Sequence, residues 1–178
     1  IAKMPHLLIA TQALPVGNMR ELLTLAKSKP GNLTYSSAGN GSTFHMAGEL
    51  FKYLSNTVIV HVPYRGGGPA LTDAVSGQVD ISFPSFVAAL PFVKAGKVKA
   101  LAITSSSRSL LLPEVPTIAE AGLPGYEFTS WFMLLAPAGT PSAIVLKINQ
   151  AVTETMQSPE GAERVAKEGT GNGPGSRE

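Results

Sequence analysis

The sequence predicts an α/β fold with a mostly parallel sheet, and three observations support this prediction. Short apolar strands alternate with amphipathic helical stretches along most of the chain. One of these strands, residues 57–62, is a β-branched run typical of a buried parallel strand. Two strands lead directly into Gly-rich loops that each precede a helix. Alternation at this length implies right-handed βαβ crossovers, so the strands are expected to share one sheet.

Composition excludes several classes of protein. The chain has 178 residues, 44% hydrophobic and 15% charged, which fits a folded domain and argues against disorder. Its net charge of +2 comes from scattered basic residues, without the basic face that nucleic-acid binding requires, so no nucleic-acid partner is expected. With no Cys, it can form neither disulfides nor thiolate metal sites. No apolar run approaches the roughly 18 residues of a membrane span, and no export signal is visible.

The first elements are predicted from capping residues and apolar spacing. Residues 7–10 form a short apolar strand. Asn18 and Glu21 have the spacing of a capping box, which starts a helix that ends at residues 29–31. Residues 33–35 form the next strand. The expected buried stripe of the helix consists of Met19, Leu22, Leu23 and Ala26.

The loop Ser36–Thr43 is rich in Gly and hydroxyl-bearing residues, so its backbone can turn sharply and another molecule can approach it closely. The helix that follows points unpaired N–H groups and a partial positive charge into this loop. This arrangement predicts a binding site for an anion. The alternative is an ordinary strand-to-helix loop without a ligand, in which Ser42 or Thr43 caps the helix. The expected buried stripe of this helix consists of Met46, Ala47, Leu50, Phe51 and Leu54.

The same strand, loop and helix order recurs in the middle of the chain. The β-branched strand leads into the loop Tyr64–Gly68, and Pro69 is suited to the first turn of the next helix, which Gly77 ends. Further elements are predicted at residues 79–83 (strand), 86–93 (a helix interrupted by Pro91) and 99–104 (strand). Loops that follow parallel strands meet at one edge of the sheet, where ligands bind. Both Gly-rich loops are therefore expected to converge.

The chain changes in composition after residue 104. Thr117 and Glu120 form a second predicted capping box, whose helix is cut short by Gly122 and Pro124. Residues 126–136 form an aromatic-rich strand that contains Trp131, which is interpreted as a core residue. A longer helix starts at residues 140–141, and a tail without periodicity follows from Glu168. The expected buried stripe of the long helix consists of Ile144, Ile148, Ala151, Val152 and Met156.

No catalytic or metal-binding constellation is found in the sequence. A phosphate-binding GxxxxGK[ST] loop, a GxGxxG helix start and a GxSxG nucleophile elbow are all missing, so no nucleotide cofactor is predicted. His6, His45 and His61 are far apart in sequence, and His45 is predicted to support the anion site without acting as a general base. The acidic residues Glu49, Asp73 and Asp80 are interpreted as structural or solvated.

Several long motifs, in register over about residues 5–168, resemble the Bug family. They are YSSAGNGST (35–43), HMAGELF (45–51), VHVPYRGGGPALTD (60–73), LPEVPTIAEAG (112–122) and the segment from Trp131 to Pro141. Proteins of this family are periplasmic solute receptors of tripartite tricarboxylate transporters. The resemblance implies a type II periplasmic-binding-protein fold, in which two α/β lobes hold a small carboxylate between two loops through backbone N–H groups, hydroxyls and waters.

Carried over to this chain, the resemblance implies one complete lobe at residues 14–104. Residues 1–13 and 105–178 would form hinge strands and an incomplete first lobe. The implied ligand-binding residues are Ser36, Ser37, Gly39, Asn40, Gly41, Ser42, Thr43, His45, Tyr64, Gly66, Gly67 and Gly68. The implied partners are a small carboxylate and the membrane components of a tripartite transporter, and the implied location is the periplasm. No cofactor, metal or catalytic residue is implied.

Three departures from the family pattern modify this prediction, one of which is a Gly/Pro tail in place of the family's C-terminal section. The Gly/Pro-rich loop that supplies the other half of the family's carboxylate clamp has no counterpart here, so the chain is interpreted as an N-terminally shortened member. A lobe lacking strands would expose apolar edges, for which homo-oligomerisation or swapping would compensate. Pro84 stands where the family often has an acidic residue, which favours a simple mono- or dicarboxylate over an amino acid. Two alternatives remain: an α/β enzyme acting on a small anion, and a sensory or interaction remnant without solute affinity.

Overall fold

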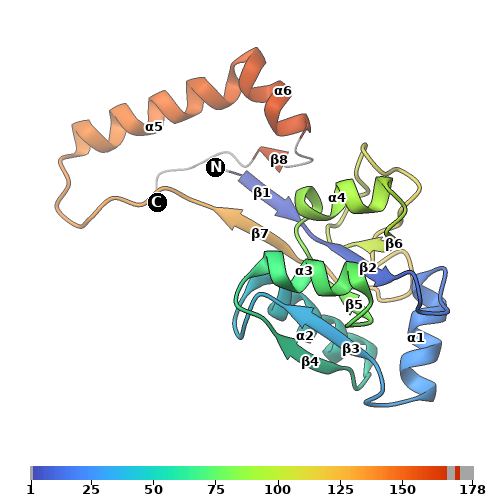
Figure 1. Ribbon diagram of the computed structural model, residues 1–178. Helices are drawn as coiled ribbons and strands as arrows, with labels where there is room; N and C mark the ends of the chain where they lie inside the picture. The colour runs from blue at the N-terminus through green and yellow to red at the C-terminus, as the bar shows by residue number, and fades with distance from the viewer. Residues whose placement is uncertain (1, 168–170, 173–178) are drawn as a thin grey trace. The chain divides into compact units, whose positions relative to one another are not determined.

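The structure is a computed structural model that describes residues 2–167 and 171–172 (Figure 1). The chain divides into two compact units. The larger unit comprises residues 5–129, and the smaller one combines residues 1–4 with residues 130–178. Residues 5–13 and 105–129 thus fall in the same unit as the predicted lobe at residues 14–104, whose boundaries stay a prediction.

The larger unit contains a five-stranded sheet in the order β4-β3-β5-β2-β6 and four helices. Its elements are β2 (Leu7–Thr11), α1 (Met19–Ser28), β3 (Thr34–Ser37), α2 (Thr43–Ser55), β4 (Val60–Pro63), α3 (Gly67–Ser76), β5 (Ile81–Ser82), α4 (Phe86–Lys94) and β6 (Val98–Ile103). This order confirms the predicted α/β fold.

The sheet is mixed, because one strand runs against the others. Strand β3 pairs in parallel with both β4 and β5, as predicted. Strand β2 pairs antiparallel with both β5 and β6, so β6 runs in the same direction as β5. Strand β2, the first strand of this sheet in sequence, thus lies between β5 and β6, which follow much later in the chain.

Strand β2 is buried along its whole length because helices cover both of its faces. Leu8 and Ala10 join the apolar cluster that includes residues of α1 and α2, whereas Leu7 and Ile9 join the cluster formed with α3 and α4. This alternation follows from the two-residue period of a strand. A strand covered on both faces has a continuous apolar sequence, which explains the run at residues 7–10.

The capping box at the start of α1 is formed as predicted. The Glu21 N–H donates to Asn18 Oδ1 at 3.0 Å, and the Glu21 carboxylate accepts from the Gly17 N–H at 2.6 Å. At the second box the exchange is reciprocal: the Glu120 N–H donates to Thr117 Oγ1 at 3.1 Å, and the Glu120 carboxylate accepts from the Thr117 N–H at 2.9 Å. No helix is assigned at this second box, where the chain forms only turns. The predicted helix there is wrong, because Gly122 takes a φ of 126° within the first turn.

Three further sequence-based expectations need correction. In α2, Met46 is 51% exposed and Leu54 also faces outward; the buried face comprises Phe44, Ala47, Gly48, Phe51 and Ser55. Strand β4 is half exposed instead of buried, because it lies at the edge of the sheet. Helix α4 continues through Pro91 to Lys94 without interruption.

The smaller unit contains the three-stranded sheet β7-β1-β8, formed by β7 (Thr129–Phe132), β1 (Ala2–Pro5) and β8 (Gly171–Asn172). Two helices follow β7, α5 (Ser142–Gln157) and α6 (Pro159–Lys167). Trp131 is 64% exposed, so the interpretation of Trp131 as a core residue is wrong for this chain. Helix α5 has no buried residue, and its predicted stripe is exposed or only half buried. Most of the predicted tail lies outside the described residues.

Candidate functional site

The two Gly-rich loops lie next to each other because they follow neighbouring parallel strands. Tyr35 lies opposite His61 in the ladder between β3 and β4, and Ser37 lies opposite Pro63. The Tyr64 N–H then donates to the Ser37 carbonyl at 2.9 Å. A Cβ at Gly39 would lie 3.4 Å from the Tyr64 carbonyl oxygen, so the two loops are in van der Waals contact here, and the φ of 115° is what favours glycine. The sequence-predicted convergence is therefore present in the structure.

The N-termini of α2 and α3 are brought together by the same arrangement. A Cβ on Gly67, the first residue of α3, would lie 3.1 Å from the ring of Phe44, the second residue of α2. Helix α3 has Gly66 as its N-cap and no side-chain capping bond. In α2, Ser42 caps the His45 N–H at 3.3 Å, whereas the N–H groups of Thr43 and Phe44 have no hydrogen-bond partner among the described residues. Two helix N-termini thus present free donors and positive dipole ends at one place.

The predicted site residues occupy different depths. Four are exposed: Asn40, Gly41, Thr43 and Gly68. Six are half buried: Gly39, Ser42, His45, Tyr64, Gly66 and Gly67. Ser36 and Ser37 are fully buried. The Ser36 hydroxyl lies 3.0 Å from the Ala70 carbonyl and 2.9 Å from Ser82 Oγ, which ties β3 to α3 and β5. Ligand contact by these twelve residues stays a prediction.

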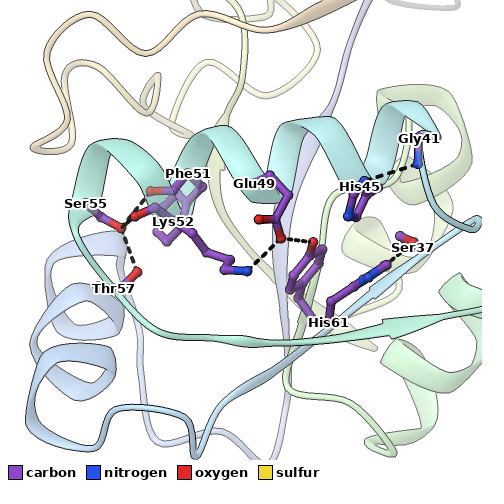
Figure 2. A network of polar contacts seen from close by, with 10 residues as sticks. Ser37, Gly41, His45, Glu49, Phe51, Lys52, Ser55, Thr57 and His61 are labelled. Atoms are coloured by element: carbon purple, nitrogen blue, oxygen red, sulfur yellow. Dashed lines mark hydrogen bonds and ion pairs between the residues drawn. The ribbon is translucent and has the colours of Figure 1, made fainter.

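Two histidines support the first loop from the protein side (Figure 2). The His45 Nδ1, on α2, accepts from the Gly41 N–H at 3.2 Å. The His61 Nε2, on β4, lies 2.6 Å from the Ser37 hydroxyl, which also accepts from the Gly39 N–H at 3.1 Å. The two imidazole rings are themselves in contact, with centroids 4.4 Å apart. The predicted support role of His45 agrees with this bond; His61 was not predicted.

A charged network continues from the histidines along α2 (Figure 2). Glu49 Oε1 accepts from the Tyr35 hydroxyl at 2.5 Å and from Lys52 Nζ at 2.7 Å. Burial alone would raise the pKa of Glu49, but these two hydrogen bonds hold it below its usual value. Burial and the adjacent Glu49 carboxylate raise the pKa of Tyr35 far above its usual value. Glu49 is therefore structural, as predicted.

Gly48 gives the Tyr35 ring its place beneath α2. A Cβ at Gly48 would lie 2.5 Å from the Tyr35 ring. The other side of the same ring stacks on His61, with centroids 4.8 Å apart and planes inclined by 24°. Tyr35 thus lies between the helix and His61, so the position of His61 depends on close approach at Gly48.

His61 and His6 are held in environments that disfavour their charged forms. Burial, and the repulsion that a charge on neighbouring His45 would exert, lower the pKa of His61 below 6.5. Burial also lowers the pKa of His6, whose Nδ1 lies 2.8 Å from the Phe83 carbonyl. The His6 ring meets the Phe44 ring edge-on, with centroids 5.7 Å apart. His6 therefore supports the first turn of α2 from the core.

The Ser37 and His61 pair does not form a nucleophilic triad. Ser37 is fully buried, and no carboxylate accepts a hydrogen bond from His61 among the described residues. A serine nucleophile needs access to substrate and a base oriented by a third group. Within the described part of the chain there is also no cluster of three or more metal-binding side chains, and no helix is long and apolar enough to span a membrane.

Comparison with solved structures defines the class of the protein. The chain superposes on R. palustris Rpa4515 with adipate with a TM-score of 0.93 and 40% identity, covering 99% of this chain and 59% of that one. It matches MatC from Rhodopseudomonas palustris with bound malate with a TM-score of 0.86 and 38% identity, covering 95% and 57%. The periplasmic binding protein BugD gives a TM-score of 0.86 at 30% identity. The chain therefore has the fold of the periplasmic binding proteins.

Sequence comparison identifies the family. Residues 1–174 match the family described as tripartite tricarboxylate transporter family receptor, and the chain belongs to that family. Protein BugT of Bordetella pertussis is 33% identical over 169 residues, covering 95% of this chain and 52% of BugT. A UPF0065 protein of Pseudomonas sp. (strain P51) is 38% identical, covering 94% and 50%. The chain spans about half the length of these curated relatives. The resemblance to the Bug family is thereby confirmed.

Proposed function

We propose that this chain is part of a periplasmic receptor that captures a small carboxylate for a tripartite transporter. The observation that carries the proposal is the pair of adjacent helix N-termini, one without a side-chain cap and the other with two unpaired N–H groups. Backbone N–H groups at a helix start bind anions without a dedicated basic side chain. Similar solved structures contain adipate and malate, both dicarboxylates.

The chemistry of the site favours a mono- or dicarboxylate over an amino acid. An amino acid would bring an ammonium group that needs an acidic partner. Pro84, after β5, stands where the Bug-family pattern often has an acidic residue. Its carbonyl accepts from the Leu7 N–H at 3.0 Å. The unpaired N–H donors of the first turn of α2 suit a carboxylate and offer no partner for an ammonium group. The membrane components of the transporter are the proposed partners.

Adding a negative side chain at the start of α2 tests the proposal. Thr43 is exposed in the first turn, so Thr43→Asp places a carboxylate where the ligand's carboxylate is proposed to bind. We expect the affinity for malate and adipate, measured by calorimetry on the complete gene product, to fall at least about tenfold. The melting temperature should stay the same or rise, because an acidic residue stabilises a helix N-terminus.

Thr43→Asn is the matched neutral control and is expected to bind both acids with nearly unchanged affinity. A wild-type protein that binds neither acid would contradict the proposal. So would a Thr43→Asp variant that binds as tightly as the control, since it would place the carboxylate elsewhere.

The same purified protein distinguishes the proposed receptor from two alternative functions. An enzyme acting on a small anion would convert malate or adipate, which mass spectrometry of the incubated ligand would reveal; the buried Ser37 disfavours this. A sensory or interaction remnant would co-purify with a partner protein and bind neither acid. Homo-oligomerisation, proposed as compensation for an incomplete lobe, is tested by light scattering.

A further inference from the structure

We propose that His45 and His61 are positioning residues that hold the Gly39–Gly41 turn in its binding shape before any ligand arrives. This inference rests on the proposed function, because it assigns the turn to carboxylate capture. His45 contacts Gly41 directly, whereas His61 acts on Gly39 of the same turn through the Ser37 hydroxyl. Their role is to hold the Gly39–Gly41 backbone, so that the unpaired N–H groups of Thr43 and Phe44, which follow it, keep a fixed direction.

The Ser37 hydroxyl determines how His61 acts. This oxygen has three contacts: the Gly39 N–H at 3.1 Å, the Gly39 carbonyl at 3.2 Å and His61 Nε2 at 2.6 Å. A hydroxyl has one proton to donate and two lone pairs to accept with. All three contacts are satisfied only when the hydroxyl donates to the Gly39 carbonyl and accepts from both nitrogens. His61 therefore donates through Nε2 and orients the hydroxyl toward both ends of Gly39.

His45 has the opposite hydrogen-bonding role. Its Nδ1 accepts from the Gly41 N–H, so Nδ1 carries no proton in this arrangement. The Gly41 backbone takes a φ of 75° and Gly39 one of 115°, both in the region that favours glycine. Glycine loses more conformational freedom on ordering than any other residue. A turn with two such glycines needs side chains that restrict it, and each histidine restrains one of them.

The contact between the two rings couples the restraints. The rings face the Glu49 carboxylate and Lys52 ammonium from α2, and the Tyr35 ring and Ser37 hydroxyl from β3. Because the ring centroids are only 4.4 Å apart, displacing either ring would disturb the other and with it the second glycine of the turn.

Paired variants separate positioning from simple packing. His61→Phe and His45→Phe keep an aromatic ring but remove the hydrogen bond. His61→Gln and His45→Asn keep a polar atom near the position of Nε2 and Nδ1 respectively. Because one neutral hydrogen bond changes an equilibrium by roughly fivefold, we expect each Phe variant to bind malate and adipate about fivefold more weakly. The Gln and Asn variants should recover most of the affinity.

A second measurement needs no ligand. Amide hydrogen exchange of the complete gene product should show faster exchange at Gly39 in His61→Phe and at Gly41 in His45→Phe, with the rest of α2 unchanged. Ser37→Ala removes the linking hydroxyl while His61 stays, so it should also speed exchange at Gly39. This variant decides the question if a Phe variant does not fold.

The outcomes distinguish the two proposals. Unchanged exchange at both glycines in the variants would overturn the positioning role. Weaker binding with no recovery in His61→Gln and His45→Asn would also overturn it, because packing alone would then explain the loss. If the wild-type protein binds neither acid but the glycine amides respond as expected, only the carboxylate function fails.

Discussion

The two Gly-rich loops begin at neighbouring strands, yet they are stabilised in different ways. The first, between β3 and α2, is held by side chains: Ser37 with His61 at Gly39, His45 at Gly41 and Ser42 at the helix start. The second, between β4 and α3, begins its helix at Gly67 with no side-chain capping bond. Side-chain hydrogen bonds hold the first loop, whereas no side chain caps the helix that follows the second loop.

For the proposed carboxylate capture, this difference predicts a division of labour. A restrained loop loses little freedom when a ligand binds, so ordering it costs little affinity. An uncapped helix start keeps its N–H groups unsatisfied and available. Together they give one preformed loop and open donors at the starts of both α2 and α3, which are in contact at Phe44 and Gly67.

The largest effect on this contrast is expected from Gly48→Ala, which removes the support of the first loop. The new Cβ would meet the Tyr35 ring at 2.5 Å and displace it against His61. We expect a loss of about 2 kcal/mol in the free energy of unfolding, measured by urea titration, since overpacking outweighs the better helix propensity of alanine.

The control is Gly68→Ala in α3, where a Cβ meets no atom within 4 Å. It should keep or slightly raise stability. A Gly48→Ala protein as stable as this control would show that Tyr35 can move freely, and the first loop would not be as restrained as described.

An intermediate effect is expected from Gly39→Ala, at the point where the loops touch. Its φ of 115° is strained for any side chain, and the Cβ would lie 3.4 Å from the Tyr64 carbonyl. The free energy of unfolding should fall by about 1–2 kcal/mol. Gly41→Ala has a φ of 75° and open space around its Cβ, so it should cost less, about 1 kcal/mol. Equal losses would argue against a tight contact between the loops.

The smallest effect is a dependence of stability on pH, caused by His61 beside the first loop and by His6 in the core. The folded-state pKa of His61 and that of His6 are both lowered below 6.5. The unfolded chain therefore binds these protons first, so stability is complete above about pH 6.5 and is lost as the pH falls through the folded-state values. Urea midpoints between pH 7.5 and 5 should decrease, and His61→Gln should flatten this decrease. An unchanged slope in that variant would assign the effect to His6.

Local features of the fold could be predicted from sequence because nearby residues determine them. Asn18 and Glu21 are three residues apart, and the capping box they form depends on little else. The position of β2 could not be predicted, because its neighbours β5 and β6 lie about 70 to 90 residues later. Its insertion between them depends on long-range apolar contacts, which a pattern of strands and helices does not specify.

The site was predicted in part for the same reason. Gly-rich loops before helices are visible in the sequence, and so is His45 in the first turn of the helix that follows the first loop. His61 was missed because it lies in a β-branched run interpreted as fully buried. Its role requires the register that sets Tyr35 opposite His61, which only the paired strands reveal. The second capping box failed to predict a helix because Gly122 ends the turn too early.

The exposure of Trp131 gives the two units separate optical reporters. It is the only Trp of the chain and lies in the smaller unit, whereas all four Tyr residues, Tyr35, Tyr53, Tyr64 and Tyr126, lie in the larger one. Tryptophan emission excited at long wavelength therefore reports the surroundings of Trp131 in the smaller unit. Tyrosine absorbance reports the larger unit, so one titration records a signal from each unit without any label.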